Sequence, residues 1–209
     1  MLAVLFRCAA WWIIIHLCFT PAVFLAQKAA LPPYWYLLAF GLLLLIYRNT
    51  AIRQIPLYLT NAETIAALAA LIPSEKKTHF LDLGCGTGSV IAPLSVLRPD
   101  VQLTGLENAV FPFLYCRLRC RNRPNTLCLY RDIFKPPWPD CHVVYAFLSP
   151  APMTAIWRKA QRELAPGTLF ISNSFPVPDV IPDQYIELGD RRKTRLFIYR
   201  IQASNADNP

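Results

Sequence analysis

The stretch that most constrains the fold is residues 80–88, which read FLDLGCGTG. It begins as an apolar, extended segment and then enters a turn with glycine at every second position, at Gly84, Gly86 and Gly88. The next residues, 89–94, read as the start of a helix. A strand, a glycine-rich turn and a helix in this order bring a nucleotide-like ligand close to bare backbone N–H groups. We therefore predict a ligand site at this turn.

The spacing of the glycines distinguishes between classes of ligand. In the dinucleotide fingerprint the third glycine follows the second by three residues, whereas here Ser89 holds that position and Gly88 comes one residue early. A P-loop is excluded because no Gly-Lys-Ser/Thr sequence follows. Asp82 precedes the turn at the end of the strand, where a carboxylate suits a ligand that carries a cationic group. The alternative is a glycine turn in some other α/β domain.

Two later strands also end near acidic residues. Residues 101–107 form a predicted strand that ends on Glu107, about 20 residues after the glycine turn, where doubly wound folds place a ribose-binding acid. Residues 127–130 form a short predicted strand that leads to Asp132. The Asp132 carboxylate is suited to accept a hydrogen bond from the exocyclic amine of adenine, and Ile133 or Phe134 is suited to pack on the ring face. These positions favour a ligand that contains a ribose and an adenine.

The run Asp82-x-Gly84-x-Gly86-x-Gly88 resembles motif I of the class I S-adenosylmethionine (SAM) methyltransferases. The resemblance covers residues 56–200, and within the fold it is nearest to the small lysine methyltransferases of ATP synthase c-subunit and adenine nucleotide translocase. Features similar to that group are the hydrophobic N-terminal segment, the proline-containing residues 56–60, and the strand exits at 148–150 and 175–178. The resemblance implies SAM as the cofactor. The cofactor-binding residues predicted in all are Thr60, Asp82, Gly84, Cys85, Gly86, Thr87, Gly88, Glu107, Asn108, Asp132 and Ile133.

The rest of residues 51–202 alternates between helical and extended patterns, which favours a sheet covered on both faces. The resemblance implies an α/β fold, a doubly wound Rossmann-like sheet of seven strands with a C-terminal antiparallel hairpin. Helices are predicted at 62–71, 109–121 and 153–164, with Thr60 or Asn61 capping the first. Further strands are predicted at 140–147 and 168–173, and the hairpin at 186–188 and 196–199.

Three polar side chains at predicted strand ends are candidate catalytic residues, namely Tyr145, Ser149 and Asn173. Open α/β sheets bind their ligands at this edge, although each residue also has an ordinary packing explanation. Methyl transfer from SAM needs a neutral nucleophile in line with the methyl group, so catalysis consists mainly of positioning and desolvation. A lysine acceptor must first lose its proton, which a partly apolar channel favours.

The N-terminal residues 1–50 are strongly apolar. Residues 8–26 carry no charge and have the ~20-residue length of a membrane-spanning helix, and a second apolar segment covers residues 34–47. Together they predict an N-terminal transmembrane helical hairpin that anchors the chain, with a signal peptide as the alternative for the first segment. We divide the chain into the anchor (1–50), the methyltransferase domain (51–202) and a disordered tail (203–209).

The basic residues predict the orientation and the partners of the chain. Arg7, Arg48 and Arg53 lie on one side of the hairpin and Lys28 on the other, which places both ends of the hairpin, and the catalytic domain, in the cytoplasm. The net charge of +8 suits either a membrane surface or nucleic acid. We expect a lipid bilayer and a protein substrate as partners, and no nucleic acid.

The seven cysteines include no C-x-x-C pair and no recognised His/Cys ligand spacing, so the sequence predicts neither a metal site nor a disulfide framework. The leading hypothesis is a membrane-anchored SAM-dependent methyltransferase that N-methylates a lysine of a membrane or membrane-adjacent protein. The alternatives are methylation of a lipid-soluble small molecule and a non-catalytic SAM-binding role.

Overall fold

A computed structural model describes residues 11–28, 32–41, 60–74, 78–135 and 137–203. The chain divides into two compact units, Met1–Leu44 and Leu45–Pro209, and each is considered by itself. The predicted tail from residue 204 onward lies outside the described residues.

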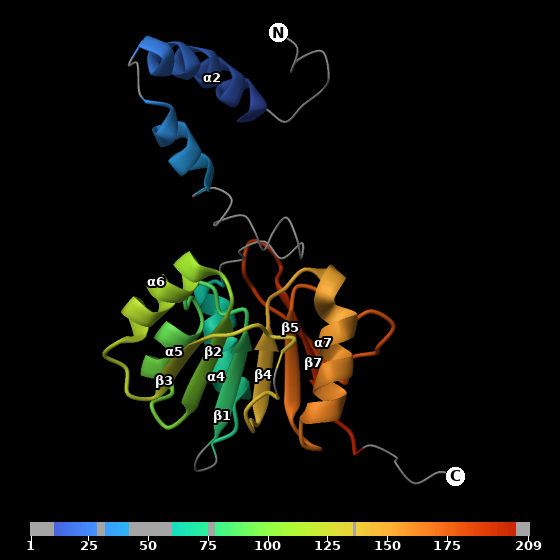
Figure 1. The fold of residues 1–209 in the computed structure, drawn as a ribbon. Coiled ribbons are helices and arrows are strands. Elements are labelled where there is room, and N and C mark those ends of the chain that lie inside the picture. Colours follow the sequence, from blue (N-terminus) through green and yellow to red (C-terminus); the bar gives the residue numbers. More distant parts are fainter. Residues whose placement is uncertain (1–10, 29–31, 42–59, 75–77, 136, 204–209) are drawn as a thin grey trace. The chain divides into compact units, whose positions relative to one another are not determined.

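The first unit contains helix α2 (Trp11–Lys28) and a second helical stretch at residues 33–41 (Figure 1). The Tyr36 hydroxyl donates a 3.1 Å hydrogen bond to the carbonyl of Ala26 between them. Among the described residues, no helix is long and apolar enough to cross a membrane. The predicted transmembrane hairpin is therefore not supported in this part of the chain: α2 includes polar residues such as Gln27 and Lys28, and residues 42–47 of the second segment lie outside the described residues.

The second unit is built on a seven-stranded sheet in the order β3-β2-β1-β4-β5-β7-β6 (Figure 1). The strands are β1 (His79–Leu83), β2 (Gln102–Glu107), β3 (Thr126–Tyr130), β4 (Val143–Ala146), β5 (Leu169–Asn173), β6 (Gln184–Glu187) and β7 (Arg195–Arg200). Strands β1 to β5 pair in parallel, while β7 pairs antiparallel with both β5 and β6. The predicted Rossmann-like sheet with its C-terminal hairpin is thus confirmed.

Helices cover both faces of this sheet. On one face, α4 (Ala62–Leu71), α5 (Ile91–Leu97) and α6 (Val110–Cys120) bury side chains such as Leu68 and Leu94 against the strands. On the other face, α7 (Pro150–Glu163) packs with Met153 and Ile156 in a second apolar cluster. Because helices cover both faces in the described part of the chain, a ligand of this sheet is expected at the edge where the carboxyl ends of the parallel strands meet.

Several predicted boundaries differ from the observed ones for local reasons. Helix α7 begins at Pro150 and not at 153, since proline in the first helical turn needs no N–H partner. Helix α5 begins at Ile91, two residues later than predicted, because the turn that contains the glycines continues to residue 90. Strand β4 is half as long as the predicted strand at 140–147.

Candidate active site

The glycine turn has the backbone geometry that its sequence predicts. Gly84, Gly86 and Gly88 have φ values of 75°, 54° and 71°, in the left-handed region that favours glycine. A Cβ atom on Gly84 would lie 2.9 Å from Cδ2 of Leu148, and one on Gly88 would lie 3.0 Å from Sγ of Cys116. The turn therefore excludes side chains at all three positions by conformation, and at Gly84 and Gly88 also by contact.

Two further predicted cofactor residues belong to this turn. The side chain of Cys85 is buried and points toward β2, because a Cβ on Gly105 would lie only 2.6 Å from its Sγ. Only the backbone of Cys85 is therefore available to a ligand. Thr87 is partly buried and lies between the last two glycines. Sequence reasoning missed Gly105, whose lack of a side chain makes room for the turn.

The Glu107 carboxylate is anchored to the glycine turn. Its Oε2 accepts a 2.9 Å hydrogen bond from the N–H of Gly86, and its Oε1 accepts from the N–H groups of Asn108 at 2.8 Å and Ala109 at 2.7 Å. A carboxylate has about four acceptor positions, so one remains for a ligand hydroxyl. Glu107 thus shapes the turn and keeps acceptor capacity for a ribose.

The second acid, Asp82, lies next to Glu107 inside the protein and is 3% exposed. Desolvation by burial, with a further contribution from the charge of Glu107, raises the pKa of Asp82 to about 8. Burial also raises the pKa of Glu107, against three backbone hydrogen bonds that lower it. Two buried acids at the ends of neighbouring strands form a site that a cationic ligand stabilises. A sulfonium and an ammonium, together with a ribose, fit this donor and acceptor set.

The predicted adenine side of the site is a short segment after β3. The Asp132 side chain accepts a 3.0 Å hydrogen bond from the N–H of Phe134, and the buried Ile133 accepts one of 2.9 Å at its carbonyl from Nε1 of Trp138. Glu163, on α7, accepts a 3.0 Å hydrogen bond from the N–H of Trp138. Lys159 pairs with Glu163 and lies over the Trp138 ring. These contacts, which the sequence did not predict, hold the segment in place.

Tyr145 forms the centre of a hydrogen-bonded cluster next to Asp82. The two residues are register partners on β4 and β1. The Tyr145 hydroxyl accepts a 2.8 Å hydrogen bond from Nδ2 of Asn173 and lies 3.2 Å from the hydroxyl of Thr60. Burial raises the pKa of Tyr145, so the phenol stays neutral. Three residues predicted from separate parts of the sequence therefore meet here.

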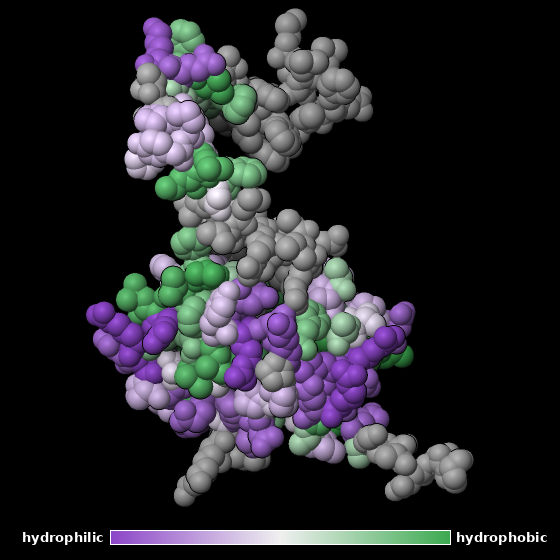
Figure 2. Space-filling view, viewed as in Figure 1, coloured by the Kyte–Doolittle hydropathy of each residue, from purple (hydrophilic) through white to green (hydrophobic). Residues whose placement is uncertain are grey.

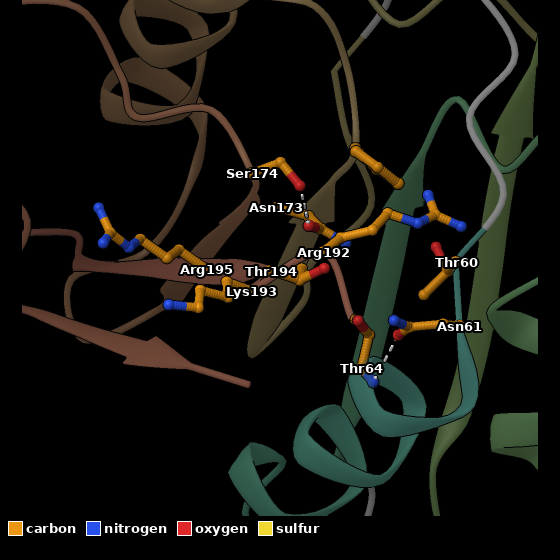
Figure 3. Close-up of a pocket in the computed structure, with 10 residues that line it drawn as sticks. Thr60, Asn61, Thr64, Asn173, Ser174, Arg192, Lys193, Thr194 and Arg195 are labelled. Carbon is orange, nitrogen blue, oxygen red and sulfur yellow. Dashed lines mark hydrogen bonds between the residues drawn. The ribbon is translucent and has the colours of Figure 1, made fainter. Parts of the chain in front are cut away.

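A pocket of about 250 Å³ opens beside this cluster (Figure 3). Its walls come from the residues before and within α4, the carboxyl ends of β4 and β5, and the loop between β6 and β7. The lining residues are Thr60, Asn61, Thr64, Phe147, Asn173, Ser174, Arg192, Lys193, Thr194 and Arg195. Ser149 does not line it: this buried residue is the N-cap of α7, so the structure does not place it with the other two candidate catalytic residues.

Sequence reasoning missed the loop that closes the pocket. Oδ1 of Asp190 accepts a hydrogen bond from the N–H of Thr194 at 2.7 Å, while Oδ2 accepts from the Thr194 hydroxyl at 2.6 Å and from Nδ2 of Asn61. These bonds lower the pKa of the Asp190 carboxyl. Asn61 also caps α4 through a 2.9 Å bond from the N–H of Thr64. The loop is thereby tied to the start of α4.

Two residues on the pocket wall have strained backbones. Ser174 and Lys193 have φ values of 65° and 50°, which are uncommon for residues other than glycine. Ser174 follows β5 directly, and its hydroxyl donates a 2.7 Å hydrogen bond to Oδ1 of Asn173. Strain of this kind concentrates at functional sites, which supports the pocket as part of the active site.

The structure also brings together three cysteines that the sequence analysis did not group. The sulfur atoms of Cys116, Cys120 and Cys128 lie within 4.8 Å of one another. The signal was present in the sequence, because Cys116 and Cys120 are one helical turn apart, but the third member comes from the neighbouring strand.

Comparison with known proteins agrees with this architecture. The model of the family described as ANTKMT methyltransferase domain matches residues 82–184, which include the acids and three glycines of the turn. A mouse protein, adenine nucleotide translocase lysine N-methyltransferase, is 28% identical over 164 residues, which cover 76% of this chain and 69% of that protein.

Solved structures share the fold at low sequence identity. An RNA methyltransferase from Salinibacter ruber, in complex with S-adenosyl-L-homocysteine (SAH), has a TM-score of 0.63 at 17% identity and covers 72% of this chain and 98% of its own. A precorrin-6y C5,15-methyltransferase from Geobacter metallireducens has a TM-score of 0.53 at 14% identity, covering 73% and 96%. In its fold, its acidic site and its match to the family model over residues 82–184, the chain is similar to class I SAM-dependent methyltransferases and, among them, to the lysine methyltransferase of adenine nucleotide translocase.

Proposed function

We propose that this enzyme transfers methyl groups from SAM to the side-chain amine of a lysine, in a protein that lies in or next to a membrane. The mouse relative, named as a lysine N-methyltransferase, supports lysine as the acceptor. The observation that carries the proposal is the pairing of Asp82 with Tyr145. Because Asp82 on β1 and Tyr145 on β4 are register partners, the acidic cofactor site and the pocket lie on neighbouring strand ends. A cofactor and an acceptor can meet between them.

The residues around the acidic site provide the binding of the cofactor. When bound, SAM supplies an electrophilic methyl group on a sulfonium. Asp82 offers a carboxylate for the cationic part of the ligand, and Glu107 offers the remaining acceptor position for the ribose. The predicted contact of Asp132 and Ile133 with adenine is part of this proposal, as is that of Asn108.

The pocket favours the neutral form of an amine. Arg192, Lys193 and Arg195 line it together (Figure 3). Arg195 is paired with Glu187, so Arg192 and Lys193 supply the positive charge that disfavours a second cation. An entering lysine therefore loses its proton more readily than in water. The Tyr145 hydroxyl is buried behind the pocket wall and bonds to Asn173 and Thr60, which line the pocket, so it acts on the acceptor nitrogen through these two side chains. We assign the Tyr145 hydroxyl a positioning role, and Asn173 keeps this hydroxyl in place.

The exposed surface of the catalytic unit supports a site next to lipid. Helix α6 presents Phe111, Leu114, Tyr115 and Leu118 to solvent, with exposed fractions of 41–61%, and Figure 2 shows hydrophobic surface over this helix. Exposed arginines, such as Arg117, lie in its last turn. Apolar and aromatic side chains with neighbouring cations suit an anionic lipid surface.

The N-terminal unit carries the same kind of surface. Phe19, Phe24, Leu37 and Phe40 are 57–71% exposed. We include membrane anchoring through residues 1–50 in the proposal, with the catalytic unit on the cytoplasmic side that the arginines of the N-terminal region favour. Alkaline extraction of membranes that contain the full-length protein measures this attachment: retention in the pellet is expected, and release into the supernatant would contradict it.

The acceptor is tested with purified full-length enzyme, isolated membranes and SAM labelled in the methyl group. We expect label in protein, recovered as methyl-lysine after hydrolysis, and none with the Glu107→Ala variant. Label in the lipid extract would replace the proposal by methylation of a lipid-soluble molecule. Label in neither fraction, from an enzyme that binds SAH, would favour a binding role without catalysis.

A further inference from the structure

The cluster of Cys116, Cys120 and Cys128 has no role in the proposed chemistry. Cys116 and Cys120 lie one turn apart on the inner face of α6, and Cys128 lies on β3 beneath them. The three Sγ atoms are within 4.8 Å of one another, and those of Cys116 and Cys128 are 2.9 Å apart. Three sulfur atoms thus face a common point from two elements.

The burial of these residues fits a small enclosed site. Cys116 is fully buried and Cys120 is 5% exposed, whereas Cys128 is partly exposed and provides a path from solvent. Thiolates prefer soft cations, and Zn–S bonds are about 2.3 Å long, so sulfur atoms grouped at this spacing need only small side-chain movements to share one ion.

We propose that Cys116, Cys120 and Cys128 bind a zinc ion as three thiolates. Each S–H bond is replaced by an S–Zn bond, the three protons pass to solvent, and no oxidation takes place. Zinc sites of this type hold a fourth ligand. A water molecule can fill this position, and so can Cys85, whose Sγ is 3.8 Å from that of Cys116.

The surroundings suit the negative charge of such a site. Three thiolates and Zn²⁺ sum to a charge of about −1, and the arginines at the end of α6 and just beyond it, including Arg119 and Arg121, supply positive charge near the same helix end. The site would also lie behind the glycine turn, since Gly88 packs against Cys116. A bound ion would join α6 to β3 at the back of the cofactor site.

The test measures zinc bound to the full-length protein. The reduced protein is treated with a chelator under anaerobic conditions, given one equivalent of ZnCl2, and desalted before elemental analysis and native mass spectrometry. We expect about one zinc per chain, and less than about a tenth of that in Cys128→Ser. Cys18→Ser and Cys141→Ala, which alter one exposed and one buried cysteine away from the cluster, should keep the ion.

A second variant guards against loss of folding. Cys120→Ser should lose zinc in the same way as Cys128→Ser, and circular dichroism with SAH binding reports whether each variant is folded. The proposal is overturned if the wild-type protein retains no zinc, or if folded Cys128→Ser and Cys120→Ser retain as much as the controls. A Cys116–Cys128 disulfide in zinc-free, freshly isolated protein, found by peptide mapping, would also overturn it.

Discussion

The carboxyl edge of the sheet has two halves of opposite charge. At β1 and β2, the buried acids Asp82 and Glu107 surround the glycine turn. Toward β5 and the hairpin, the pocket is lined by Arg192, Lys193 and Arg195. The first half is built into strand ends and buried, whereas the second is carried on an exposed loop.

The difference matches the two reactants of methyl transfer. A cationic cofactor is stabilised by the acidic half, while the basic half disfavours an ammonium and so, under the proposed function, favours the neutral form of a lysine acceptor. Tyr145 lies between the halves as the register partner of Asp82. The comparison predicts that variants of the acidic half change cofactor binding, and that variants of the basic half change turnover of the acceptor.

The largest effect is expected for Glu107→Ala. The change removes the proposed ribose acceptor and leaves the backbone N–H groups of Gly86, Asn108 and Ala109 without their carboxylate. Hydrogen bonds to a charged group contribute about 1.5–3 kcal/mol each. The affinity for SAH should therefore fall about 100-fold or more. Calorimetric titration with SAH measures this. The matched control is Glu187→Ala, an exposed strand residue paired with Arg195; equal losses in both variants would contradict the assignment.

Tyr145→Phe tests the junction of the two halves. Removing the hydroxyl should lower kcat ~30-fold through misplacement of the acceptor, while SAH affinity changes little, because the ring still packs against Phe80. Steady-state kinetics with saturating SAM, next to SAH titration, separates the two quantities. A fall in SAH affinity as large as the fall in kcat would assign Tyr145 to the cofactor half.

Asp82→Asn should lower the affinity for SAM about tenfold at pH 8.5, a binding free-energy change of about 1.4 kcal/mol. It should lower the affinity for SAH less, because SAH lacks the sulfonium charge. The pH matters because the Asp82 pKa of about 8 leaves the carboxyl largely protonated at neutral pH. SAM affinity of the wild type should therefore rise with pH up to about 8, and the variant should show no such rise. Parallel pH profiles of the two proteins would refute the role of this carboxylate.

The same group links folding stability to pH in the ligand-free protein. Burial raises the folded pKa of Asp82 above its unfolded value, so its contribution to stability is present below the unfolded pKa of about 4 and is lost as pH rises to about 8. Chemical denaturation between pH 5 and 8.5 should show that the wild-type free energy of unfolding falls relative to that of Asp82→Asn. A constant difference across this range would contradict the shift.

The smallest effect is expected at the exposed loop. The double change Arg192→Gln and Lys193→Gln should reduce turnover about threefold at pH 7.5 and move the pH–rate profile to higher pH, because the acceptor amine then holds its proton more strongly. Solvent screening keeps the effect small. The control is the double variant Arg158→Gln and Arg162→Gln on α7, outside the pocket. If the pH–rate profile of the loop variant does not shift, the loop has no part in the mechanism.

The sequence predicted the acidic half better than the basic half. Gly84 to Gly88 and Glu107 follow from local patterns of strand, turn and spacing, which do not depend on distant contacts. Asp190 and the basic loop could not be predicted, because β7 inserts between β5 and β6 and brings this loop to the pocket across the sheet. The cysteine cluster also depends on distant contacts, because Cys128 lies beside Cys116 and Cys120 only when β3 has formed.

The central claim is that Asp82 and Glu107 enclose a cationic adenosyl ligand, and calorimetry of SAM binding to the full-length protein at pH 7 tests it most directly. Titrations in two buffers of different ionisation enthalpy report the protons exchanged on binding. We expect one site per chain and the release of about one proton from Asp82, a release that is absent in Asp82→Asn. No binding to the wild type, or binding with the same proton exchange in both proteins, would contradict it.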